Sequence, residues 1–186
     1  MLLEDVRGEK DRYPALHLDN CIVRMRVSVY CHCKIDIKNS ALDSIKKNAL
    51  VARRSDAAIE RCTVVKKVRV KSLQASESIF MDKVLAGNPQ KGCIRYSRIN
   101  PKGNRLPRVY NCTFAPVTFC SDLPWQSSYL KLRRGCGEAV THWAENGGEI
   151  GVYHQAHYSL KQKNLAIKFN EYLPVGLQPV LIDIDC

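Results

Sequence analysis

Four short stretches of this sequence can be aligned with one another, and this internal repeat constrains the fold more than any other feature. The stretches are residues 16–23, 35–42, 57–64 and 73–80. An apolar or small residue holds the first, third and last places of each. The sixth place is always small, and the residues that fill it are Cys21, Ser40, Cys62 and Ser78. Alternation at the start of each stretch indicates a strand with one buried face.

The inward-facing places of each stretch then change from odd to even, so the chain must bend near the fifth place. Asn20 and Asn39 stand at that place, and asparagine tolerates the left-handed conformation of a tight corner. The unit recurs at offsets of 19, 22 and 16 residues. Repeats at such spacings predict the stacked coils of a solenoid, in which equivalent side chains form columns.

The chain divides into three predicted segments. Residues 1–14 are polar and are expected to form a flexible leader. Residues 15–112 are expected to form the β-helix coils, and residues 113–186 a C-terminal covering and capping segment. Within the coils, the polar stretch 46–56 is expected to bulge as a loop, with a helical turn as the alternative.

Smaller patterns predict individual elements. The alternation of residues 25–37 predicts a long strand. In the capping segment, residues 138–145 between two glycines predict a short helix. Leu165, Ile167 and Phe169 alternate with less apolar residues, which predicts a strand over 165–169. The apolar tail, residues 180–184, predicts a final strand.

Several ordered pieces of this sequence resemble the last coils of bacterial right-handed parallel β-helix proteins. The pieces are residues 59–65, 75–80, 92–97 and 107–112, followed by residues 148–153 and 171–177, which resemble a closing segment. The resemblance implies a mainly β fold: a right-handed parallel β-helix with a small mixed α/β capping segment. Some such proteins are associated with phage-tail-like or contractile injection gene clusters, which implies a context rather than an activity. Relatives tend to be longer upstream, so this chain is consistent with the carboxyl portion of a longer protein.

The net charge of +11 is unevenly distributed. Residues 1–99 carry 20 Lys and Arg against 11 Asp and Glu, whereas residues 100–186 carry 9 against 7. A basic excess attracts nucleic acid, anionic glycans or an acidic partner. The alternative is a solvated coat of charge that keeps exposed strands from pairing edge to edge. Aromatic residues do not interleave with the charges, which disfavours a nucleic-acid surface.

Nine cysteines are an odd number, and no export signal precedes them, which argues against a disulfide scaffold. The stretch from Cys31 through His32 to Cys33 is the most metal-like, yet structural zinc sites space their cysteines more widely. Two inward-facing core cysteines are therefore expected, with a site that also uses Cys112, Cys120 or Cys136 as the alternative.

Two groups of polar residues could carry chemistry. Three histidines near acids in the capping segment suit either acid–base work or ordinary capping: His142, His154 and His157, near Glu145, Glu149 and Tyr153. Outward places of the repeats could form an acidic column and a basic one, or solvated faces with mixed neighbours. The candidates are Asp19, Asp36 and Glu60 for the acidic column, and Arg24, Arg26, Arg69 and Lys71 for the basic one.

The sequence assigns no catalytic, cofactor-binding or metal-binding residue. It predicts a non-enzymatic structural or interaction module, which the resemblance places in a phage-tail-like assembly. The alternative is a β-helix enzyme or lectin that acts on acidic polysaccharides. The expected partners are other proteins of the assembly, with an anionic glycan or nucleic acid as weaker candidates and no membrane. Without a signal peptide or an apolar run of about 18 residues, a cytoplasmic location is expected.

Overall fold

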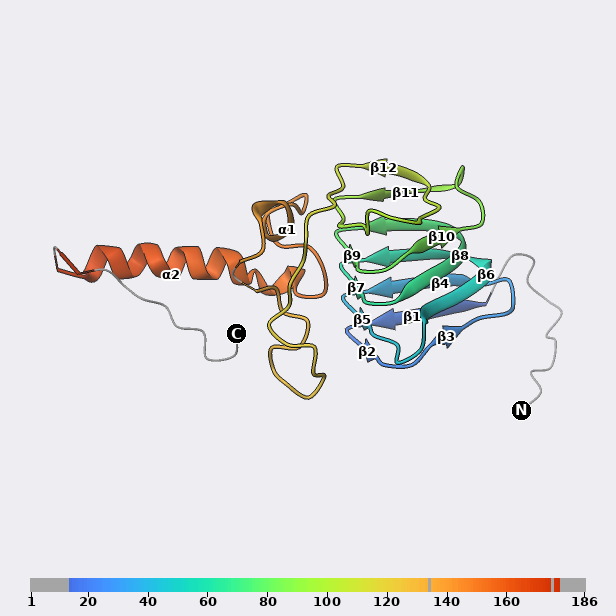
Figure 1. Ribbon diagram of the computed structural model, residues 1–186, viewed down its shortest axis with the longest axis horizontal. Coiled ribbons are helices and arrows are strands. Elements are labelled where there is room, and N and C mark those ends of the chain that lie inside the picture. Colours follow the sequence, from blue (N-terminus) through green and yellow to red (C-terminus); the bar gives the residue numbers. More distant parts are fainter. Residues whose placement is uncertain (1–13, 134, 175, 178–186) are drawn as a thin grey trace.

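The computed structural model describes residues 14–133, 135–174, 176 and 177. Its first part is a parallel β-solenoid of about five turns, seen in Figure 1 as a stack of short strands coloured from blue to yellow-green. A segment of turns and short helices lies beside the stack, and a longer helix projects from it, away from the coils. The predicted fold class, a mainly β parallel β-helix with a small capping segment, is confirmed.

Strands line three faces of the solenoid. The first face holds β1 (Ala15–Asp19), β4 (Lys34–Lys38), the second halves of β6 (Asn48–Glu60) and β8 (Lys67–Ser76), β11 (Gly92–Arg95) and β12 (Arg108–Tyr110). The second face holds β2 (Ile22–Val23), β5 (Ala41–Leu42), β7 (Thr63–Val64) and β9 (Ile79–Phe80). The third holds β3 (Val27–Ser28), the first halves of β6 and β8, and β10 (Val84–Ala86).

The strand register follows the repeat found in the sequence. The first places of the four stretches pair in one column, made by Leu16, Ile35, Ala57 and Leu73. The third places pair in the next inward column, made by Leu18, Ile37, Ile59 and Ala75. Most of these side chains are fully buried, so the interior is a set of stacked apolar columns.

Each coil turns at one residue with a positive φ directly after the first face. Six residues take this conformation, with φ between 47° and 51°: Asn20, Asn39, Arg61, Glu77, Tyr96 and Asn111. The bend predicted at the fifth place is therefore confirmed. A left-handed conformation costs about 1–2 kcal/mol for a residue with a side chain, so these corners depend on the coils that hold them.

The small residues at the sixth place form a hydrogen-bonded ladder through the corner. Its members are Cys21, Ser40, Cys62, Ser78, Ser97 and Cys112. The Ser78 hydroxyl accepts the main-chain N–H of Cys62 at 3.1 Å and donates to the carbonyl of Ser76 at 2.8 Å. Ser97 does the same for the amide of Ser78. Burial raises the pKa of the Cys62 thiol to about 12, which keeps it protonated as a donor to Glu60.

The loop predicted for residues 46–56 is wrong, because most of this stretch belongs to β6. Leu50 and Ala52 are buried while Arg53 faces solvent, and a bulge interrupts the strand after Ala52. Parallel strands of the coils on both sides pair with this stretch, although its polar composition gives no sign of a strand. The strand predicted over 25–37 is present as two shorter strands, β3 and β4, on different faces of the coil.

The strand predicted over residues 165–169 is also wrong, since these residues lie in helix α2 (Tyr158–Tyr172). Leu165, Ile167 and Phe169 are 42–57% exposed, so their alternation does not mark a buried sheet face. The stretch contains no glycine or proline and is rich in residues that favour a helix.

The rest of the capping segment agrees better with the sequence. The helix predicted over 138–145 is present in a shorter form as α1 (Glu138–Thr141), and a 3₁₀ helix, η1 (His154–Ala156), follows. The final strand predicted over 180–184 lies outside the described residues.

The capping segment is fastened to the coils by both polar and apolar contacts. The buried Arg98 guanidinium donates to the carbonyls of Phe80, at 2.8 Å, and Ala115, at 3.1 Å. A small apolar cluster lies between the coils and the segment, made by Ile79, Val117, Val140, Ala144 and Ile150. The side-by-side position of the two parts in Figure 1 therefore reflects direct packing.

We expect Ser78→Ala to lower the free energy of unfolding by about 1–3 kcal/mol, because it leaves the buried main-chain N–H of Cys62 without a partner. Ser78→Cys is the matched control, since cysteine fills the same place in the coil before, and it should lose less than Ser78→Ala. Urea unfolding followed by circular dichroism measures both. Equal losses for the two variants would contradict the role of the ladder.

Candidate functional site

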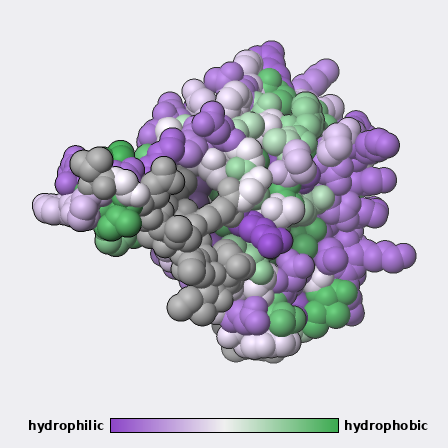
Figure 2. Space-filling view, turned by 60° about the vertical axis from the view of Figure 1, so that its left-hand side comes forward, coloured by the Kyte–Doolittle hydropathy of each residue, from purple (hydrophilic) through white to green (hydrophobic). Residues whose placement is uncertain are grey.

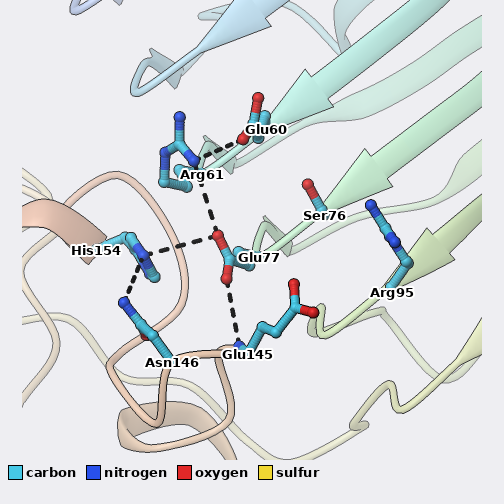
Figure 3. Close-up of a pocket in the computed structure, with 8 residues that line it drawn as sticks. All are labelled: Glu60, Arg61, Ser76, Glu77, Arg95, Glu145, Asn146 and His154. Carbon is cyan, nitrogen blue, oxygen red and sulfur yellow. Dashed lines mark hydrogen bonds and ion pairs between the residues drawn. The ribbon is translucent and has the colours of Figure 1, made fainter.

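A cleft lies at the corner where the first face ends and the capping segment begins (Figure 3). Its volume is about 420 Å³. We call it the corner cleft. Acids, bases and amides line it: Glu60, Arg61, Ser76, Glu77, Arg95, Glu145, Asn146 and His154. Carboxylates beside a histidine are the residue types that acid–base catalysis uses, so the partners of each group decide what the cleft can do.

Glu77 is the central residue of the corner cleft. It occupies one of the left-handed corners, and it is 9% exposed. Its Oε1 accepts the main-chain N–H of Glu145 at 3.3 Å, and its own carbonyl accepts the N–H of Gly151 at 2.8 Å. Both donors belong to the capping segment. The side chain and backbone of Glu77 therefore join the coils to that segment.

His154 faces Glu77 from the capping segment, with its Nε2 3.7 Å from Glu77 Oε2. Its Nδ1 lies 2.8 Å from the carbonyl of Glu149, which can only accept, so Nδ1 carries a proton. The Asn146 side-chain oxygen accepts the N–H of Gly148, which turns the amide NH₂ toward His154 Nε2 at 3.3 Å. Nε2 therefore accepts, and the ring is the neutral Nδ1–H tautomer.

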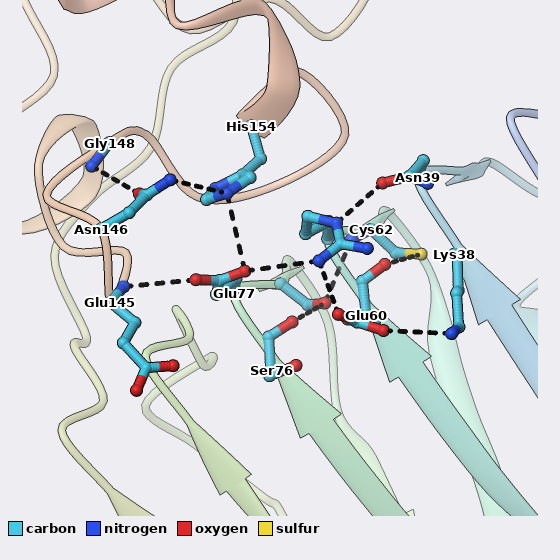
Figure 4. A network of polar contacts seen from close by, with 12 residues as sticks. Lys38, Asn39, Glu60, Cys62, Ser76, Glu77, Glu145, Asn146, Gly148 and His154 are labelled. Carbon is cyan, nitrogen blue, oxygen red and sulfur yellow. Dashed lines mark hydrogen bonds and ion pairs between the residues drawn. The ribbon is translucent and has the colours of Figure 1, made fainter.

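The other charges of the cleft continue this network along the coils (Figure 4). Arg61 Nη1 lies 2.5 Å from Glu60 Oε1 and 4.0 Å from Glu77 Oε2. Arg61 Nε donates to the Asn39 side chain at 2.9 Å, and Lys38 pairs with Glu60 at 3.5 Å. Glu60, Glu77 and His154 thus have partners within the protein. The contacts of these three residues are those of a polar clamp between the coils and the capping segment.

A second hollow, of about 330 Å³, gathers other predicted residues of the capping segment. His142 and Glu149 both line it, and Glu149 is 3% exposed. Burial raises the pKa of Glu149 to about 7, although the main-chain N–H of Tyr158 and the charge of Lys131 oppose the shift. The Glu149 Oε1 and His142 Nε2 atoms are buried without a hydrogen-bond partner.

The predicted histidines are therefore divided between two places. His154 shares the corner cleft with Glu145, whereas His142 shares the second hollow with Glu149. The His157 ring lies 5.8 Å from the His154 ring. Tyr153 donates its hydroxyl to the carbonyl of Tyr129 at 2.7 Å. These residues do not form one acid–base set.

A groove of about 660 Å³ follows the edge where the third face turns into the first. Four cations line it on successive coils, and we call them the basic edge: Lys34, Arg54, Lys71 and Lys91. His32, Cys33 and Asp56 complete the lining. Hydrophilic side chains also project from the protein along the right-hand margin of Figure 2.

Asp56 is the one carboxylate of this groove, and its hydrogen-bonding capacity is already used. Its Oδ2 accepts a hydrogen bond from the Lys91 ammonium at 2.7 Å, and its Oδ1 accepts one from the Ser72 hydroxyl at 2.5 Å. Lys91 and Ser72 hold the pKa of the Asp56 carboxyl below its usual value. Within the described part of the chain, Lys34, Arg54 and Lys71 have no carboxylate at ion-pair distance. The basic edge therefore carries uncompensated positive charge.

The acidic column predicted from the sequence is not present. Lys38 stands between Asp19 and Glu60 in their column, while Asp36 pairs with His17 and Ala58 in another. The alternative of mixed neighbours is confirmed for these acids.

The basic column is only partly correct. Arg69 and Lys71, the latter a member of the basic edge, lie on the same strand, but Arg24 and Arg26 belong to the first coil, next to β2 and β3. Sequence reasoning missed Arg54, because it took residues 46–56 for a loop. The inward alternation of Leu50 and Ala52 was the signal that could have placed it.

Two cysteines, Cys33 and Cys62, belong to the apolar core of the coils. Cys33 is buried as predicted, but Cys31 is exposed, which corrects the expectation of two inward cysteines. The His32 ring lies 2.9 Å from the carbonyl of Arg54. All six cysteines of residues 15–112 are free thiols, so the coils hold together without disulfides. No group of three or more His, Cys, Asp or Glu among the described residues could hold a metal ion.

Comparisons with protein-family models, curated proteins and solved structures find no significant match to this chain. The resemblance to β-helix proteins of phage-tail-like clusters therefore stays a prediction beyond the fold itself. No described helix is long and apolar enough to cross a membrane.

We expect the stability of the protein to fall as the pH rises from about 5 to 8. The pKa of Glu149 is about 7 in the folded state and 4.5 at its ordinary value. Between these pH values the folded state binds a proton that the unfolded state has lost, so stability falls as the pH rises through this range. Glu149→Gln should remove this dependence and stabilise the protein above pH 7 by on the order of 3 kcal/mol. Urea unfolding at several pH values measures it, with the exposed Glu138→Gln as the control. A Glu149→Gln profile that parallels the unmodified protein would refute the assignment.

Proposed function

We propose that this protein is a non-enzymatic binding module, in which a rigid β-solenoid holds an anionic polysaccharide along its basic edge. The observation that carries the proposal is the uncompensated charge of Lys34, Arg54 and Lys71 on successive coils, beside a groove of about 660 Å³. Coils are spaced by about 4.8 Å, so an extended polymer that runs along the stack meets one cation after another.

The chemistry of the groove supports a glycan over a nucleic acid. Among the described residues that line the groove there is no Phe, Tyr or Trp, and the one ring is that of His32, whereas proteins that bind single strands stack successive bases on several aromatic rings. An extended anionic glycan needs only cations and hydrogen-bond donors along its path. A steep dependence of affinity on salt is expected in either case.

The partners of the corner cleft support a binding role over catalysis. Glu77 and His154 hold the capping segment on the coils, and the lone pair of His154 Nε2 is taken by Asn146. A general base needs a free lone pair beside the reacting group.

The wider setting that we propose is a larger phage-tail-like assembly, as the resemblance implies. Exposed apolar side chains along α2 support further protein contacts, because the helix projects from the coils (Figure 1). A cytoplasmic location belongs to the same proposal. Co-purification from native lysate tests the assembly, and a lone monomer without partners would count against it.

A second candidate is an enzyme that cleaves acidic polysaccharides at the corner cleft. The observation that favours it is the group of three carboxylates and one histidine in that cleft, namely Glu60, Glu77, Glu145 and His154. Release of new reducing ends from polygalacturonate, abolished by Glu77→Gln in a folded variant, would replace the binding proposal with this one.

We expect the triple variant Lys34→Gln, Arg54→Gln, Lys71→Gln to bind dextran sulfate at least about tenfold more weakly than the unmodified protein at 0.15 M salt. The control is Lys46→Gln, Lys47→Gln, Lys102→Gln, which removes the same charge from exposed positions elsewhere. It should change the affinity less than about threefold. Fluorescence anisotropy with labelled polymer measures both.

Two results would overturn this proposal. Equal losses in the two triple variants would show that only net charge matters. Tighter binding of poly-L-glutamate or of single-stranded DNA than of dextran sulfate, at matched charge density, would show that the partner is a different macromolecule.

A further inference from the structure

Next to the basic edge, three arginines surround a smaller hollow of about 400 Å³ on the third face. They are Arg53, Arg69 and Arg105, and the rest of the lining is Val70, Leu85, Ala86 and Gly87. Among the residues that line the hollow, none carries a carboxylate. We call this place the arginine hollow.

The stacking of the coils explains why a hollow exists there. Arg69 pairs with Leu85, and Leu85 pairs with Arg105, so two arginines flank one leucine in a column. Their backbones are about 10 Å apart, since each coil adds about 4.8 Å. Lys71 and Gly87 are two residues further along their strands, and the N–H of Gly87 bonds to Val70. Gly87, which has no side chain to fill the space, lines the hollow together with the three arginines.

The hydrogen bonding of Arg69 points to a missing partner. Its Nε is buried and has no hydrogen-bond partner. A guanidinium presents its donors in a planar fork that matches the oxygens of phosphate, sulfate or carboxylate. A buried donor without a partner costs free energy, and an oxyanion over Gly87 would supply the acceptor.

We infer that the arginine hollow binds a tetrahedral oxyanion, a sulfate or phosphate ester, of the polymer that lies along the basic edge. This inference rests on the proposed function and names the class of polysaccharide. Three guanidinium groups around one hollow suit a group with three free oxygens, whereas a carboxylate offers two. Arg53 directly precedes Arg54, and Arg69 stands two residues before Lys71, so the hollow and the edge form one surface.

The test compares polymers of equal charge density: dextran sulfate, which carries sulfate esters, and polygalacturonate, which carries only carboxylates. We expect dextran sulfate to bind at least about tenfold more tightly. Gly87→Glu places a carboxylate among the arginines and should abolish this preference. Gly87→Ala is the matched control, because a Cβ at Gly87 would meet its nearest atoms at an ordinary 3.5 Å. It should keep the preference, as should Arg24→Gln, which removes a cation far from the hollow.

Further measurements distinguish a free anion from a polymer-bound one, and a failure of this inference from a failure of the proposed function. Arg105→Lys keeps the charge but loses the planar fork, and it should lower the preference for sulfate at least about threefold. Titration with inorganic sulfate shows whether the free ion suffices: saturable binding lost in Gly87→Glu supports the site. Equal binding of the two polymers, or a preference that survives Gly87→Glu, would overturn this inference. The proposed function would still stand if Lys34→Gln, Arg54→Gln, Lys71→Gln weakened both polymers.

Discussion

The structure depends on the hydrogen bonds that join each coil to the next at the corner after the first face. At that corner the backbone adopts a left-handed conformation, and a small polar residue follows it. The side chain of Ser78, for example, accepts a hydrogen bond from a main-chain N–H of the preceding coil and donates one to a carbonyl of its own coil. Strand pairing satisfies the straight parts of each coil, and the main-chain N–H of a left-handed residue such as Arg61 or Glu77 bonds to a carbonyl of the next coil. The amide of the residue that follows the corner bonds instead to a small polar side chain of the next coil, which helps to hold the strained conformation.

Once the positions of the corners are set, the positions of the outward-facing residues are set as well, because equivalent residues of successive coils lie in register and point in the same direction. This explains why two charged surfaces of one solenoid behave differently. At the corner, the capping segment covers the side chains, and Glu77, His154 and Asn146 contact one another or the main chain of that segment across the joint. At the opposite end of the first-face strands lies an open groove, and Lys34, Arg54 and Lys71 have no carboxylate at ion-pair distance among the described residues.

The fold was largely predictable from the sequence, because the repeat carries both its inward columns and its corners. The pairing of Ile37 with Ile59, the bend at Asn39 and the column of small residues that includes Ser40 and Cys62 all follow from the alignment of the stretches, whereas the hydrogen bonds within that column do not. The candidate surfaces were less predictable. Arg54 lay in a stretch whose strand is stabilised by neighbouring coils rather than by its own composition. His154 and Glu77 are 77 positions apart, and only the packing of the capping segment brings them together.

We propose that an anionic polymer contacts the basic edge and leaves the corner cleft untouched. Amide chemical-shift mapping with dextran sulfate on the isotope-labelled protein tests this most directly. The largest shifts should fall on the amides of Arg54, Lys71 and Gly87, with those of Glu77 and Asn146 unmoved. Shifts concentrated at Glu77, Glu145 and Asn146 would contradict the account and move the binding site to the corner.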